Sequence, residues 1–132
     1  MNRSDEREQA FILLFEKSFN HDLTAEKVLE LAYETGAIEK SGFTEKLFLT
    51  ASENIDAVDE LINKYRKGRA FSRISKVSLA ALRLAVCEIN FFDDIPVGVS
   101  INEAVELTKK YASEDEFAFV NGILGSLVKG EE

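Results

Sequence analysis

Few side chains in this chain have the chemistry that catalysis requires. The single histidine, His21, stands in a polar stretch, where an isolated histidine is typical of a solvated loop. The single cysteine, Cys87, lies among apolar residues without a nearby candidate base, and a nucleophile needs such a base beside it. One histidine and one cysteine fit a zinc site poorly, and no glycine-rich phosphate loop occurs. These residues predict a protein without catalytic residues, bound metal or other cofactor.

Charge is unevenly distributed along the chain. The formal net charge is −8, which argues against nucleic-acid binding by the chain as a whole. Residues 61–87, however, hold seven basic side chains and no acidic one. The basic stretch at 64–76 is explained either as a solvated linker or as a contact with a polyanion, through phosphates and stacked bases. The sequence leaves both interpretations open.

Two arginines and an aromatic residue recur near the start of the chain at helical spacing. Arg3 and Arg7 are four residues apart, and Phe15 follows Arg7 by eight, so a helix places them near one face. Arginines beside an aromatic ring suit single-stranded nucleic acid. The structural alternative is that Phe15 belongs to the core.

The element expected to hold these residues in place is a helix over residues 77–92. Its apolar positions cover more than one face, and a helix that is apolar most of the way round is a buried helix against which others pack. Its short length, together with Arg83 and Glu88 inside it, argues against a membrane span.

Apolar periodicity predicts further helices over residues 4–19, capped by Ser4, over 25–35, capped by Thr24, and over 44–66, starting at Thr44. Two capping boxes, Ser-x-x-Glu at 100–103 and 113–116, predict the starts of the last two helices.

The pair Asn121-Gly122 is a hairpin signal, but the helical period continues through it, so a helix is favoured. The absence of a side chain at Gly122 would then permit close helix packing.

These elements predict an all-α fold of six to seven helices. The basic stretch divides one domain, residues 1–132, into two packed three-helix bundles, at about 1–66 and about 73–130. One cysteine allows no intrachain disulfide, and the polar start lacks the features of a signal peptide. We expect a cytoplasmic protein.

Several ordered motifs resemble the NusB family of bacterial transcription antitermination factors. They are RE at 7–8 with LF at 14–15, RI at 73–74, LRLAVCEI at 82–89, Pro96 followed by INEAVELTK at 101–109, and FVNGIL at 119–124. The resemblance is strong over residues 73–125 and weak over 20–66. It implies an all-α fold of two packed helical bundles and no enzymatic activity.

The resemblance also implies partners. NusB proteins bind the boxA element of nascent ribosomal RNA leader transcripts together with NusE, a ribosomal protein of the small subunit, and so help RNA polymerase resist termination. Five positions match the RNA-contacting positions of the family: Arg3, Arg7, Phe15, Tyr111 and Asp115. The NusE surface would lie around the central helix, at Ser78 and Leu82.

The chain departs from the family at its N-terminal arginines, which are reduced to Arg3 and Arg7 and interrupted by Asp5 and Glu6. We therefore expect weak RNA binding by the chain alone and tighter binding with NusE. The alternative function is a protein-interaction module that binds NusE with little RNA contact of its own. A homodimer that covers the RNA face is the alternative assembly.

Overall fold

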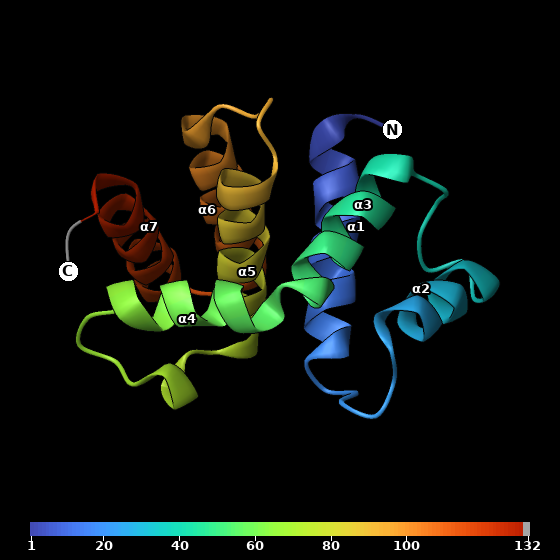
Figure 1. Cartoon of the computed structure of the whole chain (residues 1–132), viewed down its shortest axis with the longest axis horizontal. Helices are drawn as coiled ribbons and strands as arrows, with labels where there is room; N and C mark the ends of the chain where they lie inside the picture. The colour runs from blue at the N-terminus through green and yellow to red at the C-terminus, as the bar shows by residue number, and fades with distance from the viewer. Residues whose placement is uncertain (131–132) are drawn as a thin grey trace.

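The computed structural model describes residues 1–130, which form seven α-helices and one 3₁₀ helix. Their bounds are α1 Arg3–Lys17, α2 Ala25–Glu34, α3 Gly42–Glu53, α4 Ile55–Tyr65, η1 Phe71–Arg73, α5 Lys76–Phe91, α6 Val97–Tyr111 and α7 Glu114–Lys129. The predicted all-α fold is confirmed. Figure 1 shows α1, α2 and α3 on one side of α5 and α6 and α7 on the other, with α4 crossing one end of α5 towards α7.

The central helix α5 joins the two groups of helices, as the sequence predicts. It packs against α1, α3, α4, α6 and α7. Every residue from position 78 to position 88 is buried except Arg83, because apolar and small side chains face all of these neighbours. None of the helices within residues 1–130 has the length and apolar character that crossing a membrane requires.

The predicted helix over residues 44–66 is wrong, because Asn54 divides it into α3 and α4. Asn54 leaves the helical conformation at φ −110° and ψ 24°, and its side-chain amide donates to the Thr50 carbonyl at 2.9 Å. Apolar residues continue at helical spacing on both sides of the break, so periodicity alone does not reveal it.

The break directs α4 towards the C-terminal helices. It packs against α5 and α7, and Arg83 of α5 donates two hydrogen bonds of 2.8 Å to the Asp59 carboxylate of α4. The division of the packing therefore falls at Asn54 and not at residues 66–73, where the sequence places it (Figure 1).

The predicted N-cap Ser4 and the predicted start at Thr44 are also wrong. The side chain of Asn2, not Ser4, accepts the hydrogen bond that caps α1, and α3 begins at Gly42 with Ser41 as its cap, two residues before Thr44. Asn and Ser are equally good caps, so residue type could not decide between Asn2 and Ser4. The predicted cap of α2, Thr24, is confirmed and accepts from the Lys27 amide at 3.1 Å.

The capping box predicted at Ser100 is wrong, because α6 already begins at Val97 and Ser100 is buried within it. Ser113 does precede α7, but its side chain makes no capping hydrogen bond. Its expected partner, Glu116, accepts hydrogen bonds from Ser75 and Ser78. In both Ser-x-x-Glu patterns, side chains that were expected to cap a helix thus contact a neighbouring helix instead.

The helix through Asn121-Gly122 is confirmed as part of α7. The reason given for Gly122 is wrong, however, since a Cβ atom there would meet nothing within 4 Å. Gly122 therefore does not mark a close approach of two helices within residues 1–130.

Candidate nucleic-acid interface

Arg7 lies in the interior of the protein, although the sequence predicts that it contacts RNA from one face of the first helix. Its side chain is 5% exposed, and its Nε atom donates to Glu88 Oε2 at 2.6 Å. Its Nη1 atom lies 3.6 Å from Glu103, and Ser100 donates to the second oxygen of Glu88 at 2.7 Å. The network ties α1 to α5 and α6. A direct contact of Arg7 with RNA stays a prediction, which this burial does not favour.

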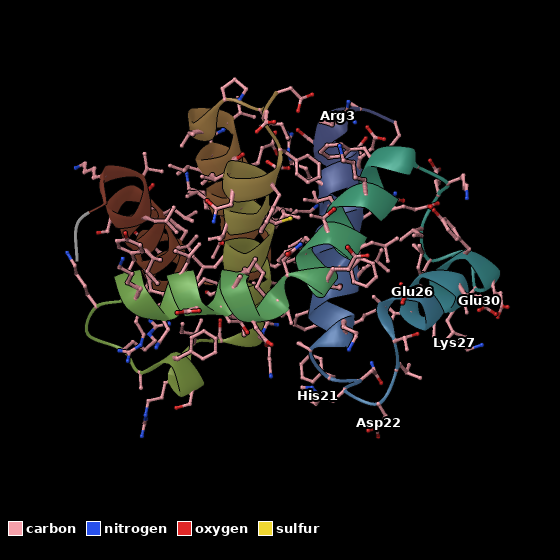
Figure 2. All side chains as sticks on the ribbon, viewed as in Figure 1. Arg3, His21, Asp22, Glu26, Lys27 and Glu30 are labelled. Carbon is pink, nitrogen blue, oxygen red and sulfur yellow. The ribbon has the colours of Figure 1, made fainter. Side chains whose placement is uncertain are left out.

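Arg3 is exposed but belongs to a different part of the surface from Phe15. Its guanidinium carbon lies 4.0 Å from the centroid of the Phe43 ring of α3, and Nη1 pairs with Glu6 at 3.3 Å. Figure 2 shows Arg3 at the N-terminal end of α1 and His21 beyond its C-terminal end. Phe15 lies near that C-terminal end, because α1 ends at Lys17. The structure does not gather the predicted arginines and aromatic residues into one patch.

An aromatic stripe runs along α1 towards its C-terminal end. Phe11 and Phe15 are four residues apart in α1 and share one helix face, and Phe19 follows four residues later, in the turn after Lys17. Phe15 and Phe19 meet edge to face with their centroids 5.0 Å apart, and Tyr111 of α6 lies 5.3 Å from Phe11. Tyr111 is 43% exposed and Phe19 is 57% exposed. The structure therefore places the predicted residues Phe15 and Tyr111 on one aromatic face, which we define by Phe11, Phe15, Phe19 and Tyr111.

A carboxylate is bound at one end of this aromatic face. Lys110 donates to Glu8 Oε2 at 2.7 Å, and the Tyr111 hydroxyl donates to the same oxygen. Burial would raise the pKa of Glu8, but the two hydrogen bonds and the Lys110 charge outweigh it and hold that pKa below its usual value. The hydrogen bond to Glu8 in turn raises the pKa of Lys110 and that of Tyr111. The predicted residue Asp115 is exposed nearby in sequence, in the first turn of α7.

This arrangement predicts that the Glu8→Gln variant loses stability in a pH-dependent way. Because the pKa of Glu8 is lower in the folded protein, its stabilising effect is complete above the unfolded pKa and disappears as the pH falls through the folded pKa. Thermal unfolding should show the variant slightly less stable than wild type at neutral pH and equal to it at acidic pH. Glu106→Gln, which removes a more exposed carboxylate beside Lys109, is the control. A stability difference that persists at acidic pH would contradict the assignment of ionised Glu8 as the stabilising group.

The two residues with the clearest catalytic potential have no reactive setting. His21 is exposed in the loop after α1, as predicted. Cys87 is buried, and burial together with the neighbouring Glu88 charge raises the pKa of its thiol to about 12, so it carries no thiolate at neutral pH. Within residues 1–130, no three His, Cys, Asp or Glu side chains are grouped so that they could hold a metal ion.

The sequence as a whole matches a known family. Residues 4–129 match the family described as the NusB family. The chain belongs to the NusB family.

Individual relatives agree along their full length. The transcription antitermination protein NusB of Clostridium acetobutylicum is 42% identical over 134 residues, which cover 100% of this chain and 98% of that protein. The protein of the same name from Natranaerobius thermophilus is 41% identical, over 94% of this chain and 92% of its own length.

Solved structures of NusB proteins share the fold. NusB of T. maritima superposes with a TM-score of 0.87 at 33% identity, covering 99% of this chain and 93% of that chain. A crystal structure described as the antitermination factors NusB and NusE in complex with dsRNA superposes with a TM-score of 0.85 at 29% identity. The matched region there covers 97% of this chain and 96% of that chain.

The partner surface predicted at Ser78 and Leu82 is not available in this structure. Both side chains are fully buried, and the Ser78 hydroxyl donates to Glu116 at 2.8 Å. The contact of these two side chains with NusE, which the family resemblance implies, stays a prediction that their burial in this structure does not favour.

Sequence reasoning also missed Phe19, the most exposed of the large apolar side chains within residues 1–130. Its signal was present in the sequence, since Phe11, Phe15 and Phe19 are spaced for one helix face. The predicted helix includes Phe19, whereas the nucleic-acid contacts predicted on that helix extend only to Phe15.

Proposed function

We propose that this chain is an RNA-binding transcription antitermination factor. It binds boxA-type RNA of nascent ribosomal transcripts together with NusE, in the cytoplasm, and helps RNA polymerase resist termination. The observation that carries the proposal is the aromatic face, with exposed rings at Tyr111 and Phe19, on a chain that matches the NusB family along residues 4–129. The NusB–NusE structure solved with RNA supports both partners. Catalysis has no part in this function.

The proposed RNA contacts follow from the chemistry of each side chain. A base stacks on Tyr111 and on the accessible part of Phe15, because every base offers a π-face. Asp115 accepts hydrogen bonds from base amino groups, and Arg3 meets a phosphate at the far end of α1. Arg7 supports this surface from beneath through Glu88.

Fluorescence anisotropy tests the proposal directly. A labelled boxA RNA and a scrambled RNA of the same composition are titrated with the chain, with and without NusE, over a series of salt concentrations. We expect weak binding by the chain alone, and tighter binding that prefers boxA once NusE is present. Equal affinities for the two RNAs in both settings would exclude the function.

A second candidate function, a protein-interaction module with little RNA contact, is favoured by the pairing of the arginines and of Lys110 with carboxylates. Glu6, Glu8 and Glu88 neutralise three cations along α1 and α6. This candidate predicts that NusE is captured equally well before and after ribonuclease treatment. A homodimer that covers the aromatic face is the alternative assembly, and light scattering with and without RNA would detect it.

A further inference from the structure

Phe19 and Lys76 form an exposed pair at the place where α1 ends and α5 begins. The Lys76 ammonium lies 5.7 Å from the centroid of the Phe19 ring, and Phe15 supports that ring edge-on from below at 5.0 Å. Both Phe19 and Lys76 are exposed, and they come from segments that are 57 positions apart in the sequence (76 − 19). An exposed ring held by a second ring is a rigid platform for a planar partner.

Neither an ion pair nor the helix dipole explains the charge of Lys76. Lys76 is the first residue of α5, and the first turn of that helix holds no acidic residue. A lysine at the positive end of a helix dipole is unfavourable for folding. Within residues 1–130, Lys76 forms no ion pair, and the Glu116 carboxylate, which accepts a hydrogen bond from Ser75 at this helix start, also binds Ser78 and Arg69.

We infer that Phe19 and Lys76 form a nucleotide subsite for single-stranded RNA. A base stacks on the exposed Phe19 ring, and the Lys76 ammonium meets an adjacent phosphate. The inference rests on the proposed function and extends the RNA surface from Tyr111, which packs on Phe11, to Lys76 at the end of the basic stretch.

The chemistry of the pair favours single-stranded RNA over a double helix or a protein. A duplex keeps its base faces stacked inside, so it cannot use the Phe19 ring. Stacking also accepts every base, so this subsite adds affinity without sequence preference. Specificity for boxA would then come from elsewhere on the surface.

The test uses two variants with matched controls, in the full chain with NusE present. Phe19→Ala is paired with Phe91→Ala, which removes another exposed ring, at the opposite end of α5. Lys76→Gln is paired with Lys46→Gln, whose ammonium likewise lies beside a ring, 4.8 Å from the Phe92 centroid. The probes are labelled boxA RNA, scrambled RNA, and boxA RNA annealed to its complement. Circular dichroism checks that all four variants fold.

We expect Phe19→Ala to weaken binding of both single strands about 5- to 150-fold, which corresponds to the usual 1–3 kcal/mol for one stacked base, and to leave duplex binding unchanged. Lys76→Gln should make the slope of log affinity against log salt shallower by about 0.7, the value of one phosphate contact on a single strand. The controls should leave both quantities as in wild type.

Three outcomes would overturn the subsite. If wild type binds RNA and the two variants behave like their controls, the subsite is wrong while the proposed function stands. If the variants lose capture of NusE in the absence of RNA, the pair belongs to the protein interface. If wild type binds none of the RNAs even with NusE, the proposed function fails and the subsite fails with it.

Discussion

Replacing Arg7 with alanine should lower the free energy of unfolding by about 3–5 kcal/mol, the usual cost of breaking a buried ion pair by removing one partner. Glu88 would keep its hydrogen bond from Ser100 but lose the 2.6 Å contact from Arg7, which leaves a buried carboxylate without its cation. Urea denaturation measures the loss. Arg3→Ala, which breaks a surface pair with Glu6 and the contact with the Phe43 ring, should cost less, at most about 2 kcal/mol.

A double replacement separates the value of the pair from the cost of an orphaned charge. Arg7→Met combined with Glu88→Leu fills similar volume without charge, and such swaps are often neutral or stabilising. We therefore expect the double variant to recover most of the stability that Arg7→Ala loses. If Arg7→Ala cost no more than Arg3→Ala, the buried network would not exist in solution.

RNA binding by the same variant decides between two roles of Arg7. If Arg7 contacts a phosphate, as the family resemblance implies, Arg7→Ala flattens the salt dependence of binding. If Arg7 acts only through Glu88, the salt slope stays as in wild type and affinity falls only with the folded fraction. The buried geometry of Arg7 favours the second result.

The helices were predictable because apolar periodicity is a local property of the sequence. The central helix shows this most clearly, since apolar residues around its whole circumference required neighbours on every side. The break at Asn54 was not predictable in this way, because residues on both sides keep the same period. Cap positions were uncertain for a related reason, since Asn2 and Ser4 are equally suitable as the first cap.

The candidate site was less predictable because its contacts join distant positions. Arg7 and Glu88 are 81 residues apart, and no local pattern shows that the carboxylate on α5 pairs with the arginine of α1 in the interior. Tyr111 was associated with Phe15 only through the family resemblance, and packing then placed its ring against Phe11. Lys76 was visible only as one charge in a basic stretch until the fold set it beside Phe19.

Leu82→Ala should also cost about 2–5 kcal/mol, because Leu82 is fully buried in α5 and its truncation leaves a cavity between packed helices. Urea denaturation measures this cost, and Leu31→Ala, at an exposed position on α2, is the control with little expected effect.

The larger consequence of this variant concerns NusE. Under conditions in which Leu82→Ala remains folded, we expect it to capture NusE as wild type does, because the removed methyl groups never reached the surface. Loss of capture with unchanged stability would instead place Leu82 at the partner surface, as the sequence predicted, and would require α5 to become accessible when NusE binds. The two measurements together therefore distinguish a core residue from an interface residue, which position on the central helix alone could not do.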